Sequence, residues 1–253
     1  MAKMDLGDVT IHYEEVGQGP LAFVLCQSDH MITGTETGHG RTRYPSSQAE
    51  AVAEIEHWKA DFGRAIWWEY RGQGESSAAA KYSLPLVASD LARLLDKLEI
   101  RSAVVHGLEW GGYMAQQFAL DYPEKCAALV LDSTSSEVNA AASENWYKGA
   151  YERQKDPVTY PERPEWSVFA CRAVGSTREQ PLTPRLKHVT SPTLILAGAQ
   201  DQTRAVPAGV IMSRQLPKCT LKIFDPGGHG LIRERPREVQ ELVAQFCREH
   251  GVI

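Results

Sequence analysis

Cysteine is scarce in this sequence and is not arranged for metal binding or for a disulfide framework. The 253 residues contain five cysteines, which lie far apart and form no Cys-x-x-Cys pair. Disulfide-built folds and structural zinc sites need closely and regularly spaced ligands. An odd number of dispersed cysteines therefore predicts reduced thiols and a cytoplasmic protein. The cysteines are Cys26, Cys126, Cys171, Cys219 and Cys247.

The sequence also lacks a long apolar run and an excess of positive charge. No segment reaches the roughly 20 apolar residues that cross a bilayer. Residues 1–9 carry Asp5 and Asp8 where a signal peptide would have its apolar stretch. The formal net charge is −5 and the pI is near 5.9. Nucleic acid and anionic membrane surfaces attract basic proteins, so we expect neither as a partner.

What the sequence does contain is an alternation of short apolar runs with helical patterns. Hydrophobic residues make up 43% of the chain, which is enough for a large core. Continuous apolar strands that alternate with helices predict a mainly parallel sheet with helices on both faces, in one α/β domain. The predicted strands are residues 21–26, 64–70, 102–106, 127–131, 193–197 and 220–224, and the predicted helices are 84–98, 113–122 and 237–250.

One stretch interrupts this alternation. Residues 133–186 are polar, rich in proline and aromatic residues, and contain no clear strand. A long insertion between two core strands is often a functional lid. We therefore predict a core formed by residues 1–132 and 187–253, with a small helical lid at 133–186. The aromatic lid residues that we expect nearest a substrate are Trp146, Tyr147 and Tyr151.

A glycine-rich segment, Gly107-Leu108-Glu109-Trp110-Gly111-Gly112, joins a predicted strand to a predicted helix. It has the form of the G-x-S-x-G nucleophile elbow, with Glu109 in the position of the serine. The turn is so sharp that small residues must flank it, which explains the glycines. The first turn of a helix stabilises negative charge, so a carboxylate is electrostatically favoured at residue 109.

With this elbow, three further segments make the chain similar to the α/β-hydrolase family over nearly its whole length. Residues 69–76 (EYRGQGES) resemble the family's D-x-R-G-x-G-x-S turn. Residues 191–201, which end at Asp201, resemble the strand and loop that deliver the catalytic acid. Residues 226–229 (PGGH), which end at His229, resemble the segment that delivers the histidine. The order elbow, acid, histidine is also the family's order, so the resemblance implies the α/β-hydrolase fold.

The elbow is closest to those of epoxide hydrolases and haloalkane dehalogenases of this fold, which often read G-x-D-W-G-G. The resemblance implies a carboxylate nucleophile at Glu109, with Trp110 at the pocket. Glutamate is one methylene longer than aspartate, which displaces the attacking oxygen by roughly 1 Å. The chain departs from the family again where a His-Gly pair usually shapes the oxyanion hole. It has Gln27 and Ser28 there, and the backbone N–H groups of Gln27 and Trp110 are the expected donors.

The same resemblance implies a role for each remaining site residue. His229 would activate the water that hydrolyses a covalent ester. Asp201 would accept the Nδ1–H of His229 and stabilise the imidazolium. Asp132 is the alternative acid, since some dehalogenases place their acid after the preceding core strand. Glu109 itself has three interpretations: a covalent nucleophile, an acid/base or substrate-binding carboxylate, and a replaced serine.

These residues favour a hydrolase that is similar to epoxide hydrolases and dehalogenases and acts on a small, largely apolar organic substrate. We expect no cofactor and no metal. An ester or lactone hydrolase is the second hypothesis, with Glu109 as acid/base or as a substituted serine. A non-catalytic ligand-binding protein on a hydrolase fold is the third. The expected partner is a small molecule, and a homodimer is left open.

Overall fold

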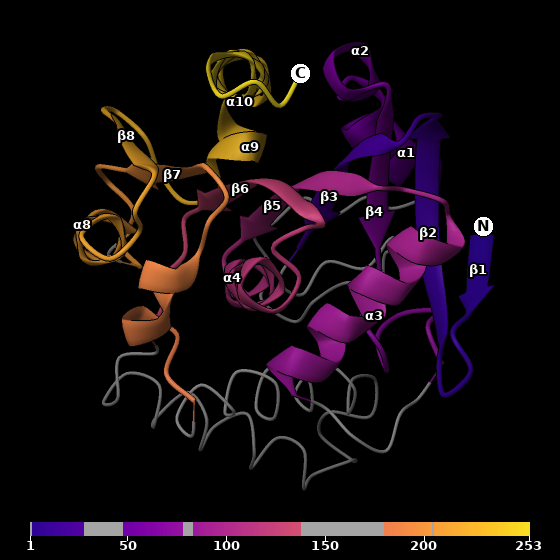
Figure 1. The fold of residues 1–253 in the computed structure, drawn as a ribbon. Coiled ribbons are helices and arrows are strands. Elements are labelled where there is room, and N and C mark those ends of the chain that lie inside the picture. The colour runs from indigo at the N-terminus through magenta and orange to yellow at the C-terminus, as the bar shows by residue number, and fades with distance from the viewer. Residues whose placement is uncertain (1, 28–47, 78–82, 138–179, 204) are drawn as a thin grey trace, which may run out of the picture.

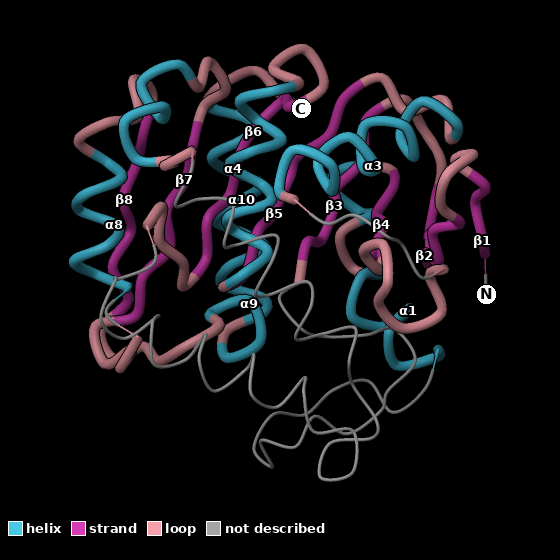
Figure 2. The backbone as a smooth tube through the Cα atoms, turned by 90° about the horizontal axis from the view of Figure 1, so that it is seen from below, coloured by secondary structure: helices cyan, strands magenta, loops and turns pink. Residues whose placement is uncertain are grey.

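The computed structural model describes residues 2–27, 48–77, 83–137, 180–203 and 205–253. Its strands form one eight-stranded sheet in the order β1-β2-β4-β3-β5-β6-β7-β8 (Figure 1). The tube view shows these strands side by side across the whole width of the molecule (Figure 2). The strands are β1 Ala2–Asp5, β2 Thr10–Gly17, β3 Leu21–Cys26, β4 Arg64–Trp68, β5 Ser102–Leu108, β6 Cys126–Asp132, β7 Thr193–Gly198 and β8 Cys219–Phe224.

Helices cover both faces of the sheet, and each face has its own apolar cluster. Side chains of α3, α4 and α8 pack into the first cluster, and those of α1, α2, α9 and α10 pack into the second (Figure 1). The strands β3 to β7 between them are buried on both sides, whereas most residues of β1 and β8 are exposed or half-buried. The helices are α1 Gln48–Glu56, α2 Lys59–Phe62, α3 Leu84–Lys97, α4 Trp110–Asp121, the 3-10 helix η2 Thr183–His188, α8 Ala205–Ser213, α9 Leu231–Glu234 and α10 Pro236–Glu249.

The parallel sheet predicted from the apolar runs is confirmed from β3 to β8, because all neighbouring pairs in that part run parallel. The sequence-based prediction missed β1 and β2, which add to the sheet in antiparallel orientation. Buried polar residues disguise β2: His12 lies fully inside and its Nδ1 is 2.8 Å from the carboxylate of Glu69. A strand whose interior includes a histidine paired with a distant glutamate has no clean apolar signature.

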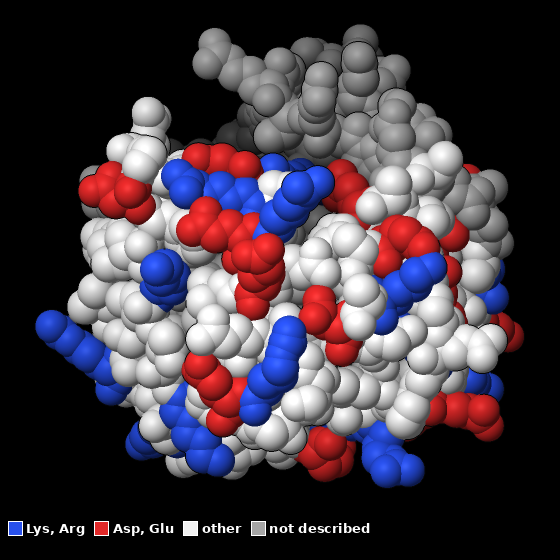
Figure 3. Space-filling view, turned by 90° about the horizontal axis from the view of Figure 1, so that it is seen from above, with Lys and Arg blue, Asp and Glu red and all other residues white. Residues whose placement is uncertain are grey.

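The face that carries α1, α2, α9 and α10 mixes basic and acidic side chains, as the space-filling view shows (Figure 3). Several of these charges pair with each other. Arg248 on α10 contacts Asp61 on α2 at 3.3 Å, and Arg235 contacts Glu238 at 3.0 Å. Exposed pairs of this kind contribute at most about 1 kcal/mol each. Their opposite charges also largely cancel, so the described residues of this face form no large patch of a single charge.

In the part of the chain that the structure describes, no helix is long and apolar enough to cross a bilayer. The four cysteines of that part, at positions 26, 126, 219 and 247, are all free thiols. Most of the predicted lid, residues 138–179, lies outside the described residues, and so does Ser28.

Candidate active site

Glu109 occupies the turn between β5 and α4 with a backbone that non-glycine residues rarely adopt. Its φ is 51° and its ψ is −113°. Such a conformation costs of the order of 1–3 kcal/mol and persists only where the surroundings impose it. The packing around the elbow glycines does so. A Cβ on Gly111 would overlap the carbonyl oxygen of Cys26, and one on Gly107 would lie 2.6 Å from the Cα of Gly112.

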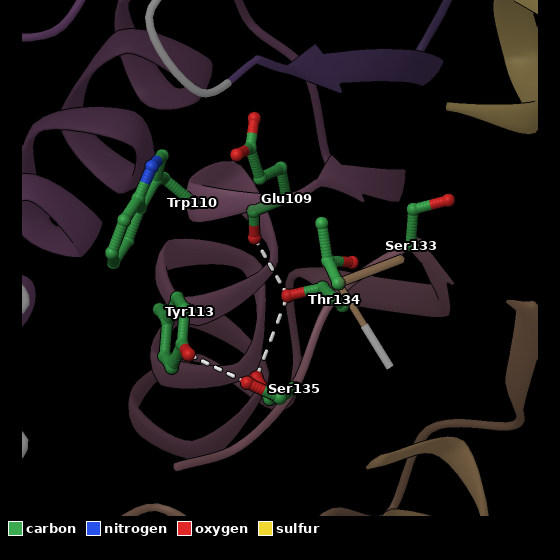
Figure 4. A pocket seen from close by; sticks show the side chains of 7 residues that line it. Glu109, Trp110, Tyr113, Ser133, Thr134 and Ser135 are labelled. Carbon is green, nitrogen blue, oxygen red and sulfur yellow. Dashed lines mark hydrogen bonds between the residues drawn. The ribbon is translucent and has the colours of Figure 1, made fainter. Parts of the chain in front are cut away.

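Hydrogen bonds from the neighbouring strand end hold the elbow on both sides of Glu109. The N–H of Glu109 donates to the carbonyl oxygen of Asp132 at 3.1 Å. The hydroxyl of Thr134 donates to the carbonyl oxygen of Glu109 at 2.6 Å (Figure 4). The N–H of Gly112 donates to the same carbonyl oxygen at 3.0 Å. The backbone of Glu109 is therefore fixed independently of what its carboxylate does.

The structure brings Glu109, His229 and Asp201 together from three separate strand ends. His229 Nδ1 lies 2.9 Å from Asp201 Oδ2, within the range of a hydrogen bond. His229 Nε2 lies 3.7 Å from Glu109 Oε2, an ion-pair distance. The ring of His229 thus sits between two carboxylates. A nucleophile, a base and an acid that act in series would need this arrangement of contacts.

Thr203 completes this arrangement, and it was not among the residues predicted from the sequence. Its backbone N–H and its hydroxyl both donate to Asp201 Oδ1, each at 2.7 Å. The other oxygen of Asp201 is thereby left to His229. The sequence carried a weak signal for this role, because an aspartate that accepts from the residue two positions later is a common turn motif.

Charge controls the protonation of this histidine. Burial by itself would lower the pKa of His229, but the hydrogen bond with Asp201 and the nearby Glu109 carboxylate outweigh it and raise the pKa to about 10. Burial likewise pushes the pKa of Asp201 upwards, yet hydrogen bonds from His229 and Thr203 hold it below its ordinary value. His229 therefore favours the imidazolium form at neutral pH, and the Glu109 carboxylate strengthens this preference.

Asp132, the alternative acid, does not occupy the place next to the histidine ring. Its carboxylate is fully buried and accepts the N–H of Leu231 at 3.2 Å and the N–H of Ile232 at 2.8 Å. The hydroxyl of Ser133 donates to it at 2.9 Å. The oxygens of Asp132 are used by the backbone that follows His229, whereas Asp201 reaches the ring.

Gln27 and Trp110, the expected oxyanion donors, lie on adjoining segments. Gly111 packs against the carbonyl oxygens of Cys26 and Gln27, which brings the end of β3 against the start of α4. The hydroxyl of Tyr70 donates to the carbonyl oxygen of Gln27 at 2.6 Å. Gln27 is 2% exposed, and its side-chain amide has no hydrogen-bond partner among the described residues. The peptide around Gln27 is thus held in place beside the elbow.

A hollow of about 90 Å³ opens next to the elbow. Trp110 and Tyr113 form its aromatic side, and the Tyr113 hydroxyl lies 2.6 Å from that of Ser135 (Figure 4). Burial and the charge of Glu109 raise the pKa of Tyr113 to about 12, so its hydroxyl stays protonated. The described lining is Glu109, Trp110, Tyr113, Ser133, Thr134, Ser135 and Thr203.

The sequence did not single out Tyr113 as lining the site, because nothing in its spacing marks it, whereas residues 133–135 belong to the start of the predicted lid. Trp146, Tyr147 and Tyr151, the predicted lid residues, lie outside the described residues. Within the described ranges no group of three or more His, Cys, Asp or Glu side chains could hold a metal ion.

Comparison with known proteins connects this geometry to a family. The model of the alpha/beta hydrolase fold family matches residues 66–163. A poly(3-hydroxyalkanoate) depolymerase of Ectopseudomonas oleovorans is 27% identical over 209 residues, 70% of this chain and 71% of that protein. The bifunctional epoxide hydrolase 2 of Sus scrofa is 35% identical over 124 residues, 48% of this chain and 20% of that protein.

Among solved structures, the enol-lactonase from Burkholderia xenovorans LB400 superimposes with a TM-score of 0.72 at 16% identity, covering 98% of this chain and 100% of that one. At this identity the likeness shows the fold alone. Together with the family match over residues 66–163, it shows that the chain has the α/β-hydrolase fold. The class of enzyme that these relatives support is a hydrolase.

Proposed function

We propose that this protein hydrolyses a small electrophilic organic molecule, an epoxide in the first instance, through a covalent ester on Glu109. The observation that carries the proposal is the position of the Glu109 carboxylate on the elbow, 3.7 Å from His229, whose other ring nitrogen bonds Asp201 at 2.9 Å. A hydrolase with a serine nucleophile would have a hydroxyl in this place. Here the group at the elbow is an anion that attacks without first losing a proton.

In the first step a Glu109 oxygen forms a bond to the substrate carbon and the carbon–oxygen bond of the epoxide breaks. The leaving oxygen takes its proton from His229, which the two flanking carboxylates hold as an imidazolium. This leaves an ester on Glu109, a hydroxyl on the substrate and a neutral histidine. Loss of the Glu109 charge at this moment weakens proton binding by His229, so the ring is ready to act as a base.

In the second step neutral His229 takes a proton from water, and the water oxygen attacks the ester carbonyl of Glu109. The backbone N–H groups of Gln27 and Trp110 are the proposed donors to the oxyanion that forms. The intermediate then expels the alcohol oxygen, which takes the proton of the new carboxylic acid. Glu109 returns as a carboxylate and His229 as an imidazolium, so one water is consumed per turnover.

The lining of the hollow beside the elbow bears on substrate polarity. Hydroxyls of Tyr113, Ser135 and Thr203 line its described part, and each of them already has a hydrogen-bond partner within the protein. An apolar group beside them therefore leaves none of these hydroxyls without a partner. We therefore keep a small, largely apolar substrate in this proposal.

An ester or lactone hydrolase is the second candidate, and a specific observation favours it: the depolymerase relative spans 70% of this chain, and by its name it acts on a polyester. In this version Glu109 takes a proton from water and the water attacks the substrate carbonyl directly. No covalent intermediate forms, so the two candidates differ in what is attached to Glu109 during turnover.

The test is a panel of small epoxides, haloalkanes, esters and lactones, assayed with the wild type and with Glu109→Gln, Glu109→Asp and Glu109→Ser. Glu124→Gln, a change on an exposed turn away from the site, is the matched control. We expect Glu109→Gln to abolish turnover, whereas the control keeps it. Mass spectrometry of His229→Gln after mixing with the haloalkanes of the panel, whose leaving halide needs no proton from His229, should detect an ester on Glu109.

A single turnover in ¹⁸O-labelled water separates the two candidates. Covalent catalysis places solvent label in the Glu109 carboxylate, while direct attack by water places it only in the product. Full activity of Glu109→Gln on every active substrate would reject both. Binding of panel members without any turnover would instead favour the ligand-binding hypothesis.

A further inference from the structure

The end of β6 contacts the elbow that carries Glu109, the residues that follow His229 and the strand that leads to Asp201. Three consecutive residues, Asp132, Ser133 and Thr134, make these contacts, and we call them the β6 bracket. On the elbow side, the carbonyl oxygen of Asp132 accepts the N–H of Glu109 at 3.1 Å, and the hydroxyl of Thr134 donates to the Glu109 carbonyl oxygen at 2.6 Å. Two bonds thus fix the peptide units on both sides of Glu109.

On the histidine side, the bracket holds the three residues that follow His229. The N–H of Gly230 donates to the Ser133 hydroxyl at 2.9 Å. The N–H groups of Leu231 and Ile232 donate to the two carboxylate oxygens of Asp132 at 3.2 and 2.8 Å. Every one of these donors is a backbone group, so the bonds set the path of the chain as it leaves His229.

The bracket is also tied to the strand that leads to Asp201. The N–H of Ser133 donates to the carbonyl oxygen of Leu196 on β7 at 3.1 Å. Ser133 has a φ of 51°, in the region that favours glycine, as Glu109 does. This conformation turns its hydroxyl so that it bonds both Asp132 and Gly230. A serine keeps such a backbone conformation only where contacts with its neighbours impose it.

Burial makes the bracket rigid. Asp132 is fully buried and Ser133 is 2% exposed. His106 on β5 is also fully buried, and its Nε2 lies 3.7 Å from Asp132 Oδ2. A buried polar group that loses its hydrogen-bond partner is strongly destabilised, so the hydrogen bonds of Asp132 and Ser133 resist lengthening.

We infer that the β6 bracket is a positioning element that sets the separation of Glu109 and His229. Its side chains act through the backbone on either side of the pair, and Asp132 does so without touching the histidine ring. Asp132 therefore contributes to the site by placing the histidine loop, and Asp201 by bonding the ring. The importance of this separation for catalysis rests on the proposed function, but the separation itself can be measured without any substrate.

The test measures proton binding by His229 in ¹⁵N-histidine-labelled protein by NMR, with the resonance assigned from His229→Gln. The variants are Asp132→Asn and Ser133→Ala. Asp90→Asn is the matched control for the first, because Asp90 is equally buried but bonds Arg71 and Arg93 instead. Ser136→Ala is the control for the second, because Ser136 is 2% exposed and bonds Thr183.

We expect both bracket variants to weaken proton binding by His229 roughly tenfold, since the ring moves away from Glu109. Amide exchange at Leu231 and Ile232 should quicken roughly tenfold in Asp132→Asn. The two controls should leave the titration of His229 unchanged even where they lower stability. A purely structural role would lower stability without moving this titration.

An unchanged His229 titration in both bracket variants would overturn the inference. If Asp132→Asn does not fold, the comparison of Ser133→Ala with Ser136→Ala decides alone, since each removes one buried hydroxyl. Because the readout needs no turnover, a negative result in the substrate panel leaves this test intact. Once a substrate is known, the bracket variants should lower kcat with little change in KM.

Discussion

Replacing Glu109 with glutamine should lower the pKa of His229, because it removes one of the two carboxylates that hold the ring as a cation. The change keeps the shape of the side chain and deletes its charge. The starting value is about 10, and the ring faces Glu109 Oε2 at 3.7 Å. Asp201 remains at 2.9 Å on the other ring nitrogen, so the pKa should stay above the ordinary value of a histidine.

The magnitude follows from Coulomb's law. Two unit charges 3.7 Å apart interact by about 1 kcal/mol in water and about 4.5 kcal/mol at an effective dielectric constant near 20. The side chains of His229 and Glu109 are 35% and 38% exposed, so solvent screens them considerably. A loss of about 1–3 kcal/mol is therefore reasonable, which lowers the pKa of His229 to about 8–9.

The assay is the titration of the ¹⁵N-labelled histidine side chains by NMR, with Glu124→Gln as the matched control. That control removes a carboxylate of the same kind from an exposed turn and should leave His229 unaffected. If Glu109→Gln shifts the pKa no more than Glu124→Gln does, the two side chains are not coupled. The account of His229 as an acid in the first step and a base in the second would then be refuted, since esterification of Glu109 neutralises the same charge.

Two further results follow from the same geometry. The pKa of His229 is raised in the folded protein to about 10, so the stability it contributes is present below pH 6.5 and lost as the pH rises through 10. The Tm of the wild type should therefore fall as the pH rises from 6.5 to 10. The fall should be smaller in His229→Gln, and equal falls in the two proteins would show that protonated His229 does not stabilise the fold. Gly111→Ala should destabilise the protein by more than about 3 kcal/mol in urea denaturation, because its Cβ would overlap the Cys26 carbonyl. Gly251→Ala, where nothing lies within 4 Å, should cost only about 1–2 kcal/mol for its positive φ, and similar losses in the two would show that the elbow is not tightly packed.

Much of the fold could be predicted from the sequence because its central strands are buried on both faces. Such strands must be continuously apolar, and each of β3 to β7 therefore stood out in the sequence. The strand β8 was also predicted, although most of its residues are exposed or half-buried. The elbow was recognisable for a local reason as well, since its sharp turn requires glycine two positions before and two positions after Glu109, at Gly107 and Gly111. Sequence reasoning failed at β2, where the buried His12 depends on Glu69, a residue 57 positions away. A pattern within a few residues cannot reveal a partner that far along the chain.

The candidate site, like the fold, was predictable from the sequence in some features and required the tertiary structure for others. The residue types and their order along the chain indicated Glu109, Asp201 and His229, because parallel strands end at one edge of a sheet. The sequence left Asp132 open as the acid, and only the tertiary structure placed its carboxylate under the backbone amides of Leu231 and Ile232. The 3.7 Å between Glu109 and His229 was equally beyond the sequence. Distances of this kind depend on how far each strand end projects and how the loops pack on each other, and those follow from contacts between residues that lie about 100 positions apart.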